Sequence, residues 1–144
     1  MKRERELEVA DRVRAHIEAR DRLVGQFGMT VEEVVPGGAR VSMTVTADHL
    51  NAAGLCHGAV LFALADVAFA LASNSHGQKA LALEVAANYL RPAQEGDRIT
   101  ARAREISRGR TTGLYAIEIT GQDQRLLAFF KATAFRFPDQ LVGE

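Results

Sequence analysis

The residues best suited to chemistry lie in an apolar stretch, residues 57–72, which reads HGAVLFALADVAFALA. The stretch opens with His57 and Gly58 and holds a single carboxylate, Asp66, near its middle. An ionised aspartate among apolar side chains loses hydration, which disfavours the charged form and raises its pKa. Because a raised pKa suits a general base, Asp66 is the first candidate for a catalytic residue. The pattern also fits a structural aspartate that caps a neighbouring chain or pairs with a buried lysine.

The start of this stretch offers a second kind of chemistry. A helix is predicted to begin near His57 or Gly58, and the first backbone N–H groups of a helix have no acceptor within it. These groups lie at the positive end of the helix dipole, so they can bind a developing oxyanion. Glycine at position 58 lets a ligand approach the backbone closely, although it also fits a simple turn with His57 as a packing residue. Asn51, in the preceding loop, fits either a water-orienting residue or a local turn.

Other reactive side chains are less well placed. Cys56 directly precedes His57, and neighbours in sequence do not face each other on a helix, so the two do not make a catalytic dyad. The four histidines lack the spacing of metal ligands, and the sequence has no glycine-rich phosphate loop. We therefore expect no metal site and no cofactor.

The predicted helix is apolar on every side. Large apolar residues around Asp66 occupy the whole circumference at about 100° per residue: Leu61, Phe62, Leu64, Val67, Phe69 and Leu71. A single sheet covers only one side of a helix, so the other side must meet a second sheet or a second chain. Packing alone thus predicts a dimer.

Residues 3–22 are rich in charge, and only a thin apolar stripe recurs at helical spacing, formed by Leu7, Val9, Val13 and Ile17. This pattern predicts a mostly solvated helix that lies on the body of the protein.

The remaining sequence has residue patterns that are typical of β-strands. FGMTVEEV and ARVSMTVTA, joined by a turn at residues 36–38, predict a hairpin. Four further strands are predicted after the apolar helix: KALALEVAANYL, DRITARAREI, TTGLYAIEIT and QRLLAFFKATAFRF. Turn residues separate them, so we expect successive hairpins. The resulting order, ββ-α-ββββ, predicts an α+β fold in which an antiparallel sheet covers the central helix.

Composition narrows the class of protein. The chain has 144 residues, 47% of them hydrophobic, which suits one domain. Lysine and arginine together equal aspartate and glutamate together, at 18 each, so no net charge favours nucleic acid or a membrane as partner.

The sequence also bears on where the protein is found. The single cysteine excludes an internal disulfide, and the N-terminal sequence lacks the apolar core of a secretory signal. The apolar run from Ala59 is shorter than the ~20 residues of a membrane-spanning helix. We expect a cytoplasmic protein.

Several segments together resemble the hotdog-fold thioesterases of the phenylacetic acid degradation (PaaI) type. They are LNAAGLCHGAVLFALADVAFALASNSHG, NYLRP, EGDRITARA and GRTTGLYAIEI. The likeness spans about residues 24–137, so we divide the chain into an N-terminal charged helix, residues 1–23, and a hotdog domain, residues 24–144. It implies a long central helix wrapped by a curved antiparallel sheet, and the extra N-terminal helix lies outside the likeness. In that family two chains join their sheets into a dimer, and dimers pair into tetramers.

The resemblance also implies roles for particular residues. Asp66 matches the catalytic carboxylate, acting as general base or as nucleophile, and Gly58 matches the glycine whose N–H polarises the thioester carbonyl. Asn51 and His57 match the asparagine and histidine of the same motif. Ala59 replaces a second glycine but still offers a backbone N–H to the substrate.

Val67 follows Asp66 directly, at a position where the family often has a serine or threonine.

The phosphates of coenzyme A need cationic side chains around them. Arg91, Arg108 and Arg110 are candidates, although each also fits a solvated charge in a turn.

The function implied is hydrolysis of acyl-CoA thioesters to free acid and CoA, with aryl or medium-chain groups such as phenylacetyl or hydroxyphenylacetyl. Coenzyme A is then part of the substrate and not a cofactor. Two alternatives stay open: a hotdog hydratase or dehydratase, and a non-catalytic acyl-CoA-binding protein.

If the helix is continuous, Gly58 and Asp66 are about 12 Å apart along its axis, too far for one carbonyl to touch both. We therefore expect antiparallel helices of two chains to share each active site.

Overall fold

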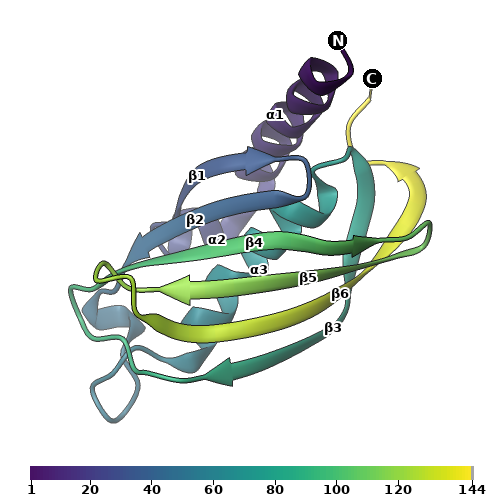
Figure 1. Ribbon diagram of the computed structural model, residues 1–144. Coiled ribbons are helices and arrows are strands. Elements are labelled where there is room, and N and C mark those ends of the chain that lie inside the picture. Colours follow the sequence, from purple (N-terminus) through teal and green to yellow (C-terminus); the bar gives the residue numbers. More distant parts are fainter. Residues whose placement is uncertain (144) are drawn as a thin grey trace.

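A six-stranded antiparallel sheet curves around one long helix in the computed structural model, which describes residues 1–143 (Figure 1). The elements are α1 (Lys2–Arg20), α2 (Arg22–Gln26), β1 (Thr30–Val35), β2 (Gly38–Thr44), the 3₁₀ turn η1 (Ala47–His49), α3 (Gly58–Asn74), β3 (Gln78–Tyr89), β4 (Arg98–Arg108), β5 (Thr112–Thr120) and β6 (Leu126–Gln140). This order confirms the predicted ββ-α-ββββ arrangement. Among these residues, no helix is both long and apolar enough to cross a membrane.

The strand order in the sheet is β1-β2-β4-β5-β6-β3. The predicted hairpins β1–β2, β4–β5 and β5–β6 are present. The expected hairpin between β3 and β4 is wrong, because β3 pairs with β6 and β4 pairs with β2. Helix α3 carries the chain from β2 to the far edge, and residues 90–97 return it to β4, so β3 is an edge strand (Figure 1).

The core lies between the concave face of the sheet and α3. Alternate residues of β5, Tyr115, Ile117 and Ile119, are at most 1% exposed and face the helix, as their period of two requires. From α3, Leu64 and Leu71 are fully buried against them. This packing fixes the position of α3 along the sheet.

One side of α3 is not covered within the single chain. Ala59 and Asp66 are exposed on it, and Phe62, Ala63 and Ala70 are half-buried. The sequence predicted a helix enclosed on all sides, so this open side is where we expect a second chain.

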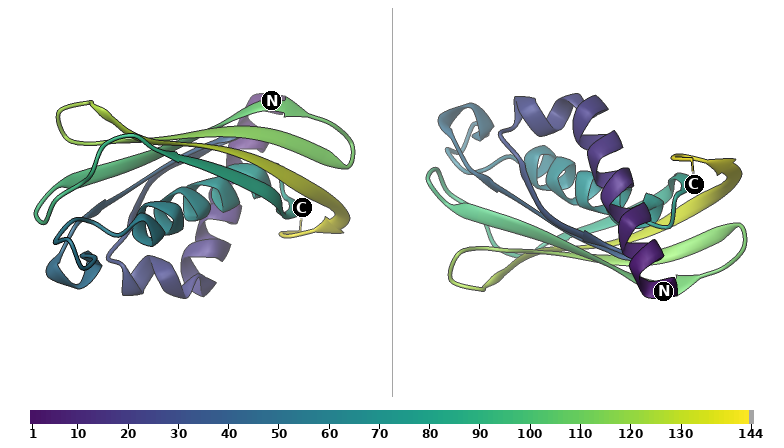
Figure 2. Two further views of the ribbon diagram at one scale, coloured as in Figure 1. Left: turned by 90° about the horizontal axis from the view of Figure 1, so that it is seen from below. Right: turned by 90° about the horizontal axis from the view of Figure 1, so that it is seen from above.

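The N-terminal helix is packed against the body on the same side of the sheet as α3 (Figure 2). Val13 of α1 is completely buried, and Leu7, Val9 and Ile17 are half-buried, which confirms the thin apolar stripe. Ala10, which the stripe did not include, is completely buried as well. A side chain at Gly77 would come within 2.9 Å of Val9, and the φ of Gly77 is +90°, so only glycine fits there. The predicted division after residue 23 falls inside α2.

Candidate active site

The loop before α3 is held by Asn51. Its side-chain Oδ1 accepts hydrogen bonds from the backbone N–H groups of Ala53 at 2.9 Å and Leu55 at 3.2 Å. Its own backbone N–H donates to the Leu55 carbonyl at 2.7 Å. Of the two sequence interpretations, the structure therefore shows the local turn, and Asn51 fixes the path of the chain into the helix.

His57 is the N-cap of α3. Its Nδ1 accepts a hydrogen bond from the backbone N–H of Ala59 at 3.2 Å. In this conformation the cap already uses the N–H of Ala59, and the contact of Ala59 with a substrate stays a prediction.

Gly58, the first residue of the helix, has no intrahelical acceptor for its N–H, and none is provided elsewhere among residues 1–143. The helix thus presents one fixed, free donor at its positive end.

Tyr89, the last residue of β3, covers this helix start. Its hydroxyl donates to the Gly58 carbonyl at 3.2 Å, and a Cβ on Gly58 would lie 3.4 Å from its ring. No local sequence pattern indicates this role for Tyr89, because its place beside Gly58 depends on β3 reaching the far edge of the sheet.

A cavity of about 350 Å³ opens beside the Gly58 backbone. Leu61, Tyr89, Leu90 and Arg91 are among the residues that line it. The structure therefore places Arg91, one of the three predicted phosphate-binding arginines, in the same cavity as Gly58.

Asp66 lies two turns further along α3, on its open side. The side chain is exposed in the single chain, so the expected burial requires a second chain. The surrounding protein nevertheless removes part of its hydration, and this desolvation, followed by repulsion from the Asp21 carboxylate, raises the pKa of Asp66. Within residues 1–143, no hydrogen bond stabilises its ionised form. A carboxylate in this state is suited to accepting a proton.

Arg108 and Arg110 lie at the opposite end of α3. Ser75, just after the helix, accepts a hydrogen bond from the backbone N–H of Gly37, whose carbonyl accepts from Glu105, three residues before Arg108. Within one chain these two arginines are therefore not assembled with Gly58.

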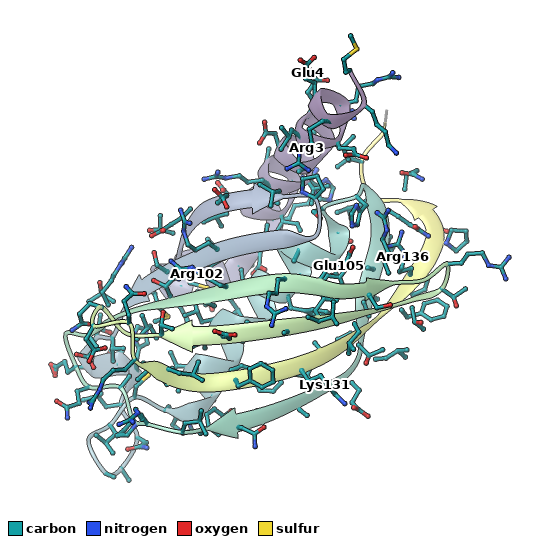
Figure 3. The ribbon with its side chains drawn as sticks, viewed as in Figure 1. Arg3, Glu4, Arg102, Glu105, Lys131 and Arg136 are labelled. Atoms are coloured by element: carbon teal, nitrogen blue, oxygen red, sulfur yellow. The ribbon has the colours of Figure 1, made fainter. Side chains whose placement is uncertain are left out.

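The same end of the sheet holds a network of polar side chains. Glu105 accepts a hydrogen bond from the Tyr115 hydroxyl at 2.6 Å and pairs with His76 Nε2 at 2.9 Å. Arg136 of β6 lies at this end of the sheet as well (Figure 3). Arg108 lines a nearby cavity of about 670 Å³ with Arg5 and Arg12 of α1.

Cys56 is buried, and desolvation raises its pKa to about 11, so it is a neutral thiol at physiological pH. This agrees with the sequence argument against a thiol nucleophile. In the part of the chain that the structure describes, no three histidine, cysteine or acidic side chains are grouped as metal ligands would be.

Removing the His57 cap is expected to loosen the helix start. His57→Ala should lower the free energy of unfolding by about 1 kcal/mol, since an N-cap side chain contributes that much. The corresponding fall in Tm is about 2–4 °C by scanning calorimetry. His57→Asn is the control, because asparagine is itself a good N-cap. If alanine and asparagine give the same Tm, the cap contributes no stability.

The pH dependence should report on Asp66. A general base works only when ionised, so kcat/KM should fall as acidification protonates Asp66. Because its pKa is raised, the midpoint of this fall should lie above the ordinary aspartate value of 3.8.

Asp21→Asn removes the nearby charge while keeping a good N-cap for α2, so it should move the midpoint to lower pH. A midpoint at or below 3.8 in the wild-type protein would contradict the raised pKa.

The comparisons with known proteins agree with this fold. The family model of the thioesterase superfamily matches residues 53–128, the segment from the lead-in loop into β6. The acyl-coenzyme A thioesterase PaaI of Escherichia coli is 42% identical over 82% of this chain and 84% of its own. The structure of E. coli PaaI superposes with a TM-score of 0.90 at 38% identity, covering 92% of this chain and 96% of that one.

Two other solved structures are similar. The TT0310 protein from Thermus thermophilus has a TM-score of 0.79 at 44% identity, covering 82% of this chain and 99% of that one. The smu.793 protein from Streptococcus mutans, bound to acetyl CoA, has a TM-score of 0.75 at 28% identity, covering 78% of this chain and 90% of that one. The chain therefore belongs to the thioesterase superfamily and is a thioester hydrolase with the hotdog fold of E. coli PaaI.

Proposed function

We propose that this protein hydrolyses acyl-CoA thioesters to the free acid and CoA, and that it prefers aryl or medium-chain acyl groups. The observation that carries the proposal is the unbonded N–H of Gly58, fixed at the start of α3 and open to a cavity. A thioester carbonyl is already activated, so one oriented donor and one base can suffice for hydrolysis. The names of the relatives support the same substrate class, since one is an acyl-CoA thioesterase and another binds acetyl CoA.

The site needs two chains. Eight residues separate Gly58 from Asp66 in one uninterrupted helix, a separation of about 12 Å. A base must reach a water that touches the polarised carbon, so these two groups of one chain cannot act on one carbonyl. Two α3 helices packed antiparallel across a two-fold axis would bring Gly58 of one chain to Asp66 of the other.

The edge strand β3 supports this dimer. One side of β3 pairs with β6, and the other is free within the described chain. Large apolar side chains are half exposed on or beside the strand: Leu81 at 54%, Leu83 at 60%, Tyr89 at 51% and Leu90 at 56%. A long, apolar, unpaired edge favours association with another chain. We infer that β3 pairs with its copy, and that dimers form tetramers as in the resembled family.

The chemistry follows from this arrangement. The thioester oxygen accepts a hydrogen bond from Gly58, which stabilises the negative charge that develops there. Asp66 of the second chain takes a proton from water as the water oxygen bonds to the carbonyl carbon. The C–S bond then breaks, and the sulfur of CoA leaves with the bonding electron pair. Asp66 attacking the carbon directly is the alternative, and an acyl-aspartate intermediate would distinguish it.

His57 and Asn51 serve as positioning residues for Gly58 in this account, because their side chains hold the helix cap and the preceding loop. Arg91 is the first candidate to bind the phosphates of CoA, since it lines the cavity at Gly58. Arg108 and Arg110 lie at the other end of α3 within one chain, so they would contribute to a shared site only from the second chain, and we rank them after Arg91.

Thiol release from a panel of substrates tests the proposed function. Phenylacetyl-CoA and hexanoyl-CoA should be hydrolysed with higher kcat/KM than acetyl-CoA. Crotonyl-CoA should release thiol without the loss of enoyl absorbance that hydration would cause. Absence of thiol release from every CoA ester would overturn the proposal, and loss of enoyl absorbance without thiol release would indicate a hydratase.

A further inference from the structure

A second concave region lies on the open side of α3, between α1 and the start of β3. Its volume is about 310 Å³. The residues that line it are Ala70 and Asn74 of α3, His16, Ile17 and Arg20 of α1, Asp21 after α1, Lys79, Ala80 and Leu81 of β3, and Leu141. We call this region the α1–β3 groove.

The groove begins beside Asp66. Ala70 is four residues after Asp66, so the two lie on the same side of α3, about 6 Å apart along its axis. Asp21 lies close enough to Asp66 for its charge to contribute to the raised pKa of that residue. The groove therefore runs from the candidate base toward the C-terminal end of α3.

The interior of the groove is mostly apolar. Ile17 of α1, Ala70 of α3 and Leu81 of β3 each contribute apolar surface to it. The amide of Asn74 is already occupied, since its Nδ2 donates to the carbonyls of Ala70 and Ala80 and its Oδ1 accepts from the N–H of Ala80. A ligand in the groove thus meets mostly alkyl surface, and the side chains of His16, Arg20, Asp21 and Lys79 also belong to the lining. Burying such surface favours an apolar occupant.

The size of the groove limits that occupant. Small-molecule sites commonly measure about 300–1,000 Å³, so this groove is at the small end of the range. It has room for one aromatic ring or a medium alkyl chain.

We infer that the α1–β3 groove holds the acyl group of the substrate, and that Ala70 and Ile17 set the length of acyl group accepted. This inference rests on the proposed function. In the two-chain site, CoA approaches along the Gly58 cavity of one chain, the carbonyl lies at Asp66 of the other, and the acyl group extends past Ala70. The N-terminal helix then has a definite role, because Ile17 of α1 forms one wall of the specificity pocket.

Filling the groove tests the inference. In Ala70→Phe, the ratio of kcat/KM for phenylacetyl-CoA to that for acetyl-CoA should fall on the order of tenfold or more, because the new ring occupies the space of the acyl group. Ala15→Phe is the matched control, since it adds the same ring to an exposed alanine of α1 outside the groove. The control should keep the wild-type ratio.

Widening the groove gives the opposite test. Ile17→Ala should raise kcat/KM for dodecanoyl-CoA relative to phenylacetyl-CoA by several-fold, and this variant adds no bulk that would disturb folding.

Unchanged ratios in both groove variants, with wild-type protein active on CoA esters, would overturn the groove assignment and leave the thioesterase proposal intact. Inactive wild-type protein would instead refute the proposed function itself.

Discussion

Asp66→Asn is expected to lower kcat for CoA ester hydrolysis by on the order of 10²–10⁴ while the protein stays folded. Asparagine has nearly the size of aspartate but cannot take a proton from water. The carboxylate of Asp66 receives no stabilising hydrogen bond from residues 1–143, so the substitution leaves no partner there unsatisfied. Steady-state kinetics on phenylacetyl-CoA, with Tm measured in parallel, checks both parts of this expectation.

Glu118→Gln is the control for this substitution. Glu118 lies between Ile117 and Ile119, which face the core, so its side chain is on the opposite face of the sheet from α3. Neutralising it should leave kcat within about twofold of wild type, as expected for a surface change far from the site. Wild-type turnover by Asp66→Asn would remove Asp66 from the mechanism.

Much of the fold could be predicted because its signals are local. Helix α3 starts at Gly58 as predicted, since a capping residue precedes an unbroken apolar run. The alternation in β5 identified its buried face, and the turn residues identified three of the hairpins.

The partner of β3 could not be predicted in the same way. Neighbouring strands in sequence usually pair, and that rule favoured a β3–β4 hairpin. The pairing of Leu81 with Phe135 instead joins residues far apart in the chain. No local pattern specifies such a contact, because it depends on α3 crossing the whole sheet.

The candidate site likewise combines features that the sequence predicts with features that only the structure shows. The sequence predicted Asp66 and Gly58 as site residues from residue type and position on the helix, and it predicted two chains from their spacing; both stay predictions. The sequence did not predict that the Ala59 N–H donates its hydrogen bond to the His57 side chain, because such a cap depends on the side-chain rotamer. The influence of Asp21 on Asp66 was also missed, since it arises from the packing of α1 beside α3.

The central claim is that each active site combines Gly58 of one chain with Asp66 of another, and mixed dimers test it most directly. Asp66→Ala lacks the base. Gly58→Pro lacks the N–H, and proline is well tolerated at the first position of a helix. Each variant alone should be nearly inactive. Gly58→Ala is the control, because it keeps the N–H and its Cβ would make ordinary contact with Tyr89 at 3.4 Å.

The decisive measurement is the activity of the two inactive variants after they are refolded together in equal amounts, with mixed dimers counted by native mass spectrometry. Random mixing makes about half of the dimers mixed, and each mixed dimer regains one of its two sites, so about a quarter of wild-type activity should return. If mixed dimers form and no activity returns, the shared site is wrong.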